Sequence, residues 1–154
     1  MRANGLKVFR TVAVFGSENA GKTTVFEEIT GCFVCESRGA PLRGYYYYKY
    51  HEYEIFDLPS TYSLETACEE FDVIIYVMNA VHLERELYNA LLCSRKAKRF
   101  IPLVNFCDRA KKFKIPVNIG LLSGVFGVKA IKATANSGRG INALLEAVHK
   151  SFLK

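Results

Sequence analysis

The sequence has few prolines, no long apolar run and no cysteine pattern typical of disulfide-bonded domains. Four of its 154 residues are proline and half are apolar, a composition that argues against a disordered chain. The purest apolar run, residues 73–78, has the length of a strand, whereas a membrane-spanning helix needs about 20 apolar residues. Residues 1–6 show no signal-peptide core. We therefore expect one soluble, cytoplasmic domain spanning residues 1–154.

The five cysteines are scattered and odd in number, which favours reduced thiols over a disulfide framework. Cys32 and Cys35 form a C-x-x-C pair, for which metal binding or redox chemistry is the alternative to ordinary thiols. The net charge is +6, with basic clusters at residues 95–99 and 109–114. Solvated helix ends and loops explain these clusters, and an anionic partner is the other interpretation.

Predicted strands and helices alternate along the chain. Apolar runs and alternating patterns predict strands at residues 8–15, 45–56, 73–78, 100–104 and 128–133. Helical spacing predicts helices at residues 22–30, 83–97, 118–124 and 141–152. This order favours an α/β fold of three layers, a mainly parallel six-stranded sheet with helices on both faces. In such sheets, ligands bind beyond the carboxyl ends of the strands, where the motifs described next all fall.

A phosphate-binding loop follows the first predicted strand and opens the first predicted helix. Residues 16–23 read GSENAGKT and match G-x-x-x-x-G-K-S/T. Glycines allow backbone N–H groups to surround phosphate oxygens, and the Lys22 ammonium would contact the β- and γ-phosphates. The residues expected at the nucleotide phosphates are Gly16, Ser17, Glu18, Asn19, Ala20, Gly21, Lys22, Thr23 and Thr24.

Two oxygen ligands for Mg²⁺ are expected beside this loop. The Thr23 hydroxyl is a hard ligand, and Asp57 ends the strand predicted after residue 45. A strand-ending aspartate also caps turns, but its pairing with the phosphate loop favours the metal role.

Base recognition is predicted at two further strand ends. Asn105, Phe106 and Asp108 belong to an N-x-x-D motif, in which Asp108 accepts the adjacent N1–H and N2–H₂ donors of guanine. Asn105 is expected to tie this segment to neighbouring backbone, and the Phe106 ring to cover the base. Thr134, Ala135 and Asn136 loosely match the S-A-K pattern of small GTPases, with a backbone N–H near Ala135 facing guanine O6.

With these motifs aligned, the sequence resembles the G domain of the ferrous iron transport protein B (FeoB) family. The segments that carry the resemblance are residues 16–26, D-L-P-S-T-Y-S-L at residues 57–64, L-E-R-E-L-Y at residues 83–88, and residues 105–108. The resemblance implies a P-loop small-GTPase (Ras-like) fold that binds Mg-GTP and Mg-GDP at the cytoplasmic face of the inner membrane. It also implies control of Fe²⁺ uptake by a membrane transporter, and a K⁺ ion held with the help of Asn19.

The sequence departs from the family pattern at four places. Ser60 replaces a glycine that contacts the γ-phosphate, and no threonine lies between Thr30 and Thr61 to complete the magnesium shell. The connection from Leu64 to Val73 is short, and Phe106 replaces a lysine. None of the motifs supplies a residue that orients the attacking water, so we expect slow or absent GTP hydrolysis.

Two other functions compete with a slow GTPase. A non-enzymatic module would bind GDP or GTP and dock a membrane or ribosomal protein. An RNA-associated GTPase would use the basic charge and the tyrosines at residues 45–48 for stacking. Strand packing also explains these tyrosines, and no separate RNA-binding domain is evident, so nucleic acid is not the expected partner.

Overall fold

The protein folds around one six-stranded sheet with the order β2-β3-β1-β4-β5-β6. The computed structural model describes residues 10–31 and 41–153. Strands β1 and β3 to β6 run parallel, and β2 joins β3 antiparallel. The strands are β1 (Arg10–Gly16), β2 (Leu42–Tyr48), β3 (His51–Asp57), β4 (Val73–Asn79), β5 (Phe100–Asn105) and β6 (Ile131–Lys132).

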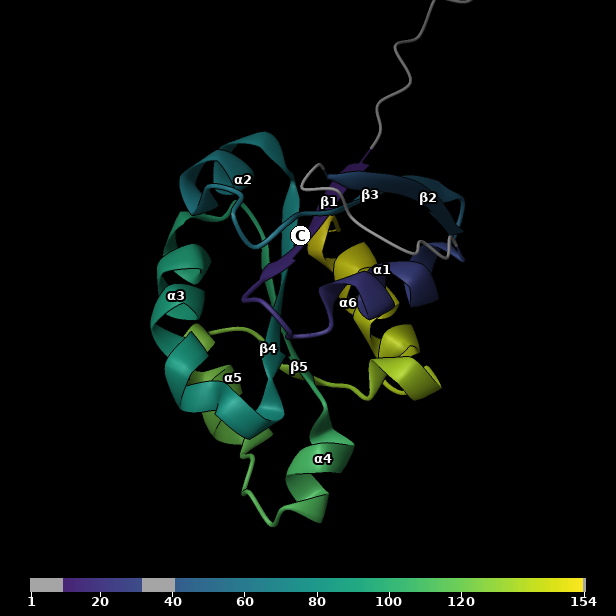
Figure 1. The fold of residues 1–154 in the computed structure, drawn as a ribbon. Coiled ribbons are helices and arrows are strands. Elements are labelled where there is room, and N and C mark those ends of the chain that lie inside the picture. The colour runs from purple at the N-terminus through teal and green to yellow at the C-terminus, as the bar shows by residue number, and fades with distance from the viewer. Residues whose placement is uncertain (1–9, 32–40, 154) are drawn as a thin grey trace, which may run out of the picture.

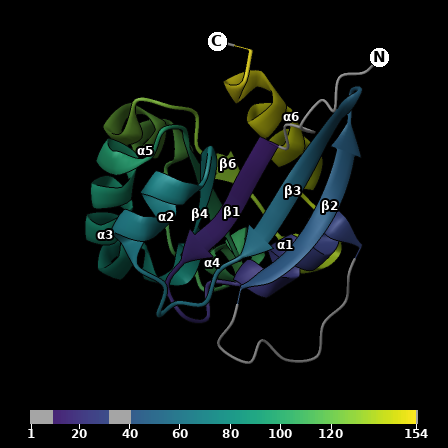
Figure 2. The same ribbon diagram turned by 90° about the horizontal axis from the view of Figure 1, so that it is seen from above.

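Helices cover both faces of the sheet, as the sequence predicts (Figures 1 and 2). The helices α2, α3 and α5 lie on one side, and α1 and α6 on the other. Their bounds are α1 (Lys22–Thr30), α2 (Leu64–Glu70), α3 (Leu83–Lys96), α4 (Cys107–Lys112), α5 (Ile119–Phe126) and α6 (Ile141–Ser151), with short 3₁₀ helices at η1 (Ala80–His82) and η2 (Ala135–Ser137). None of the described helices is long and apolar enough to cross a bilayer.

Alternation along β1 divides the core into two layers. Val12 and Val14 pack toward α1 and α6, whereas Ala13 and Phe15 pack toward α2 and α3. Residues 73–78 of β4 are buried on both faces, which is why they read as a continuous apolar run. This arrangement brings the ends of β1, β3, β4 and β5 to one edge of the sheet.

Local signals fix the ends of several helices. The chain leaves α1 at Gly31, whose φ of 72° is left-handed and whose N–H donates to Glu27. Ser63 and Asn118 cap α2 and α5 by accepting from Thr66 and Leu121. The predicted bounds of α1 are confirmed, and those of α3 and α6 differ by one residue.

Three segments differ from the sequence predictions. The strand predicted at residues 128–133 is only Ile131–Lys132, because Val128 and Lys129 are exposed and pairing with β5 begins at Ile131. The helix α4 was not predicted, since Ala110 is its single buried residue and gives no periodicity. The short connection from Leu64 to Val73 contains the seven-residue helix α2.

The predicted strands at residues 45–56 form a hairpin with a two-residue turn. Tyr48 pairs with His51, and both Lys49 and Tyr50 have positive φ angles, of 46° and 67°. Tyr46 and Tyr48 pack against the core, whereas Tyr45 and Tyr47 are exposed. The alternation predicted for this tyrosine run is therefore confirmed.

Candidate nucleotide-binding site

The phosphate loop lies between the end of β1 and the start of α1. Gly16 packs so closely on the Val77 carbonyl that a Cβ atom has no room. Gly21, with a φ of 90°, faces the Asn105 amide and the Phe106 ring in the same way. Glycine is therefore required at both positions by contact as well as by backbone conformation.

Lys22 crosses this loop from the first turn of α1. Its Nζ atom donates to the Ser17 carbonyl at 2.9 Å, which holds the loop in a closed curve. Burial lowers the pKa of Lys22, and the carboxylates of Asp57, Glu18 and Glu86 oppose that shift. Among residues 10–31 and 41–153 the Lys22 ammonium forms no ion pair, and an anion beside the loop would supply one.

Thr23 and Asp57 form the predicted pair of oxygen ligands. The Thr23 hydroxyl donates to the Asp57 carboxylate at 2.8 Å, and burial raises the pKa of Asp57. They line a cavity of about 310 Å³ at the loop, together with Glu18, Asn19, Lys22, Leu58, Pro59, Ser60 and Thr61. A hydroxyl and a buried carboxylate fit Mg²⁺, because a cation would stabilise the charge that burial disfavours.

Asn105 connects the phosphate loop with the segment after β6. Its side-chain amide donates to the Ala20 carbonyl at 3.1 Å and accepts from the Ala135 N–H at 3.0 Å. Only 1% of Asn105 is exposed. The expectation that Asn105 ties this segment to neighbouring backbone is confirmed, and the Ala135 N–H is already engaged in that contact. Its predicted role toward guanine O6 stays a prediction.

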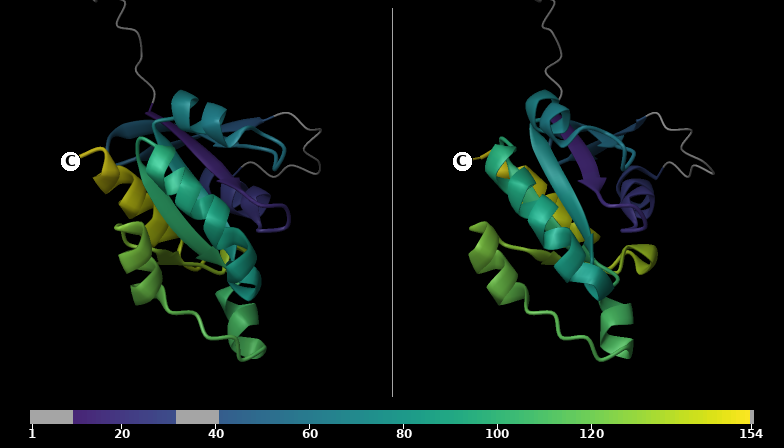
Figure 3. Two further views of the ribbon diagram at one scale, coloured as in Figure 1. Left: turned by 90° about the vertical axis from the view of Figure 1, so that its left-hand side faces the viewer. Right: turned by 60° about the vertical axis from the view of Figure 1, so that its left-hand side comes forward.

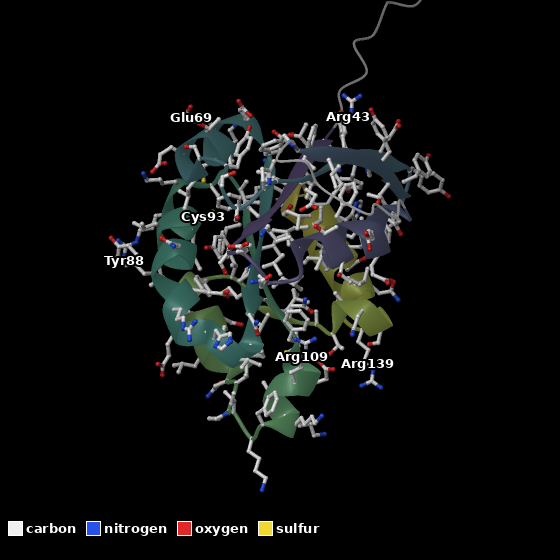
Figure 4. The ribbon with its side chains drawn as sticks, in the orientation of Figure 1. Arg43, Glu69, Tyr88, Cys93, Arg109 and Arg139 are labelled. Atoms are coloured by element: carbon white, nitrogen blue, oxygen red, sulfur yellow. The ribbon has the colours of Figure 1, made fainter. Side chains whose placement is uncertain are left out.

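Phe106 and Asp108 lie at the start of α4. The φ of Phe106 is 62°, and this left-handed residue places its ring beside Gly21 with the Arg109 guanidinium 4.4 Å from the ring centre. Asp108 is exposed at the rim of a cavity of about 490 Å³ that Lys111, Lys132, Thr134 and Arg139 also line. Figure 4 shows Arg109 at α4 and Arg139 near the start of α6, both at this end of the domain.

The remaining predicted residues lie around these two cavities. Glu18 and Asn19 form the exposed side of the phosphate loop, Ser17 and Thr24 are half-buried, and Ala20 is buried. Thr134 is buried before η2, and Asn136 is exposed within it. The structure thus gathers all the predicted residues at one edge of the sheet, whereas Cys32 and Cys35 lie outside the described residues.

Glu86 is a residue of this region that the sequence reasoning missed. It is 7% exposed on α3, and it accepts hydrogen bonds from the Ser17 hydroxyl and, at 2.6 Å, from the Asn79 N–H. Burial raises the pKa of Glu86, and the Ser17 hydrogen bond opposes the shift. Its spacing could have revealed it, because Glu86 follows Leu83 by three residues and precedes Ala90 by four, on the buried stripe of α3.

The three described cysteines are free thiols, as predicted. Cys68 on α2 and Cys93 on α3 are buried with their sulfur atoms 3.8 Å apart, and Cys107 is partly buried in α4. Burial raises the pKa of all three, so they are poor nucleophiles. The basic cluster after α3 is largely engaged in the fold, since Lys96 pairs with Glu65 and Arg99 donates to the Ser151 carbonyl.

The sheet order, the glycine-lined loop and the Thr23–Asp57 pair define a domain of the P-loop GTPase fold. The family model of ferrous iron transport protein B matches residues 10–148, and the chain belongs to that family. The resemblance inferred from the motifs is thereby confirmed.

Two kinds of relatives support this assignment. The Fe(2+) transporters FeoB of Escherichia coli K12 and Shigella flexneri are each 32% identical over 161 aligned residues, which cover 91% of this chain and 21% of the relative. The chain thus spans about a fifth of the length of these relatives. The FeoB G domain of Methanococcus jannaschii superposes with a TM-score of 0.83 at 27% identity, covering 94% of this chain and 98% of that one. The T. maritima FeoB cytosolic domain in a GDP form superposes with a TM-score of 0.84 at 26% identity. The match covers 97% of this chain and 66% of that one.

Proposed function

We propose that residues 1–154 form a single G domain that binds Mg-GTP and Mg-GDP. The bridge from Ala20 through Asn105 to Ala135 carries this proposal, because it joins the phosphate loop to the base-recognition segments. Solved relatives that are 26% identical were obtained in GDP and GMPPNP forms, which supports the same ligand class here.

The phosphates would occupy the loop at residues 16–24, with the Lys22 ammonium on the β- and γ-phosphates. The Thr23 hydroxyl and Asp57 would hold Mg²⁺, which supplies charge neutralisation between the phosphate oxygens. The Thr23 hydroxyl keeps its hydrogen bond to Asp57 in this arrangement, because its oxygen lone pairs are free to meet the metal. The Asn19 side chain, exposed on the loop, is the proposed contact for K⁺.

Guanine would be selected by the Asp108 carboxylate and covered by the Phe106 ring. Asp108 is exposed at a cavity rim and free to accept two donors of the base. A calorimetric titration with GDP, GTP and ATP tests this assignment. We expect GDP and GTP to bind and ATP to fail, and we expect Asp108→Asn to gain affinity for xanthosine diphosphate while losing GDP. Equal binding of ATP would overturn it.

The hydrolytic step is proposed to be slow. Ser60 and Thr61 line the phosphate cavity, but no threonine lies between Thr30 and Thr61 in the sequence. The competing function is a non-enzymatic module that binds the nucleotide and docks a transporter or ribosomal partner. Ser60 and the missing threonine, which depart from the family pattern, favour this function as well. Single-turnover GTP hydrolysis with and without K⁺ separates the two, and rapid turnover in K⁺ would contradict both.

The proposed physiological role is control of ferrous iron transport at the cytoplasmic face of the membrane. It rests on the family of the chain and on relatives named Fe(2+) transporters, of which the chain spans 21%. Iron uptake measured in cells that carry either the original chain or Lys22→Ala tests this role. Uptake that does not change with the variant, while the variant has lost GDP binding, would argue against it.

A further inference from the structure

The helix α5 is apolar on both of its faces. Leu122 is 7% exposed and Phe126 contacts the Phe100 ring with a centroid distance of 5.3 Å, so this face is packed on the core. The opposite face carries Leu121 and Val125, which are one turn apart and 66% and 52% exposed. A helix that is apolar all round is normally covered on both sides.

Two more exposed apolar side chains flank this helix. Phe113 follows α4 and is 61% exposed, and Val128 follows α5 and is 40% exposed. Figures 1 and 3 show α4, the connecting loop and α5 along one end of the molecule, away from the β2–β3 hairpin. We call Phe113, Leu121, Val125 and Val128, with the lysines Lys114 and Lys129, the α5 surface.

The charge along the chain segment that carries the α5 surface has a single sign, and Glu146 of α6 is the acidic residue that lines a cavity with Val128 and Lys129. Between Asp108 and Glu146 the sequence contains no Asp or Glu and seven basic residues, namely Arg109, Lys111, Lys112, Lys114, Lys129, Lys132 and Arg139. Lys114 and Lys129 are exposed and, among the residues that the structure describes, neither forms an ion pair. This stretch alone carries more positive charge than the net +6 of the whole chain.

We propose that the α5 surface binds the headgroup region of a bilayer rich in anionic lipid. Exposed aliphatic side chains beside lysines match such a boundary, where the apolar groups enter the interface and the ammonium groups meet lipid phosphates. A second copy of the chain is disfavoured, because two surfaces of like charge would repel. A nucleic acid would satisfy the lysines but leave Leu121 and Val125 without an apolar partner.

Vesicle co-sedimentation of the whole chain without nucleotide tests this inference. We expect binding to vesicles of phosphatidylcholine mixed with phosphatidylglycerol, little binding to phosphatidylcholine alone, and release by added salt. Each lysine near an anionic surface contributes about a factor of five, so Lys114→Gln combined with Lys129→Gln should weaken binding roughly 25-fold. Leu121→Gln with Val125→Gln should weaken it roughly 10-fold.

The control variants lie on α3, outside the α5 surface. Arg95→Gln, compared with Lys114→Gln alone, removes one exposed positive charge from the last turn of α3, and Tyr88→Gln removes an apolar side chain that is 71% exposed. Both should bind mixed vesicles as the original chain does. The inference is overturned by absent binding to mixed vesicles, by equal losses in the controls, or by preferential binding of a short RNA duplex in competition. GDP affinity, measured in parallel, stays the separate test of the proposed function.

Discussion

Asn105 and Ala20 are 85 positions apart in the sequence and are joined by a hydrogen bond of 3.1 Å. Because Asn105 also accepts from the Ala135 N–H, one buried side chain holds the two halves of the candidate pocket together. The Asn105 amide donates from its nitrogen to a carbonyl and accepts at its oxygen from an N–H, a pairing that an ionised carboxylate of similar size cannot reproduce because it only accepts.

Replacement of Asn105 by alanine should therefore weaken both folding and nucleotide binding. The variant leaves a buried carbonyl and a buried N–H unpaired, which lowers the free energy of unfolding by about 1–3 kcal/mol. GDP affinity should fall at least roughly 10-fold, equivalent to the loss of one such contact. Denaturant unfolding and calorimetry check this, with Asn142→Ala on the exposed face of α6 as the control. Unchanged GDP affinity would show that the two halves are held by other contacts.

Glu86 should make stability depend on pH. Burial raises the pKa of this carboxyl in the folded state, so its proton is held more tightly there than in the unfolded chain. Its contribution to stability is fully present below the unfolded pKa of about 4.3 and is lost as pH rises through the folded value.

The measurement compares the original chain with Glu86→Gln. Other groups such as Asp57 titrate in both proteins, so their contributions cancel in the difference between the two free energies of unfolding. The free energy of unfolding of the original chain, relative to the variant, should decrease as pH rises above the unfolded pKa of about 4.3. A difference that is constant with pH, or that grows, would mean that Glu86 stays ionised through its contacts with Ser17 and Asn79.

Phe106 should contribute to nucleotide affinity through its ring. Stacking of an aromatic side chain on a base is worth about 1–3 kcal/mol, so Phe106→Ala is expected to weaken GDP binding roughly 10-fold. Phe106→Tyr keeps the ring and should bind nearly as well. The matched control is Phe113→Ala, which removes an exposed phenylalanine seven residues after Phe106 and is measured in the same titration. Equal affinity of the original chain and Phe106→Ala would place the ring away from the base.

Asp57 should separate metal binding from folding. Burial raises its pKa, so Asp57→Asn removes a disfavoured charge and should leave the melting temperature without ligand unchanged or higher. The same variant loses a magnesium ligand. We expect EDTA to lower the GDP affinity of the original chain roughly 10-fold and to lower that of the variant less. A lower melting temperature with an intact EDTA response would reverse this assignment.

Much of the fold was predictable because its signals are local. The continuous apolar residues of β4 indicate a strand buried on both faces, and Gly31 marks the end of α1 with a residue suited to positive φ. The phosphate loop was recognisable because its spacing, the preceding strand and the following helix all agree. The fold and family inferred from these features are confirmed by the comparisons.

The rest depends on contacts that no short segment reveals. Strand β6 is two residues long because only Ile131 and Lys132 pair with β5. The sequence of residues 128–130 does not indicate that these residues are unpaired. The helix α4 has one buried residue, Ala110, so its pattern resembles a charged loop. Glu86 is paired across 69 positions with Ser17, and its burial could be expected only from its place on the helix.

The end of α6 lies at the start of β1, since the Arg10 guanidinium sits 4.8 Å from the Phe152 ring centre. The phosphate loop is at the other end of the same strand, so the last described residues and the pocket point in opposite directions. An affinity tag, a dye or a sensor surface coupled through Leu153 would therefore leave the mouth of the pocket open to solution. Binding kinetics can therefore be measured on protein immobilised through Leu153 without obstructing access of the ligand to the pocket.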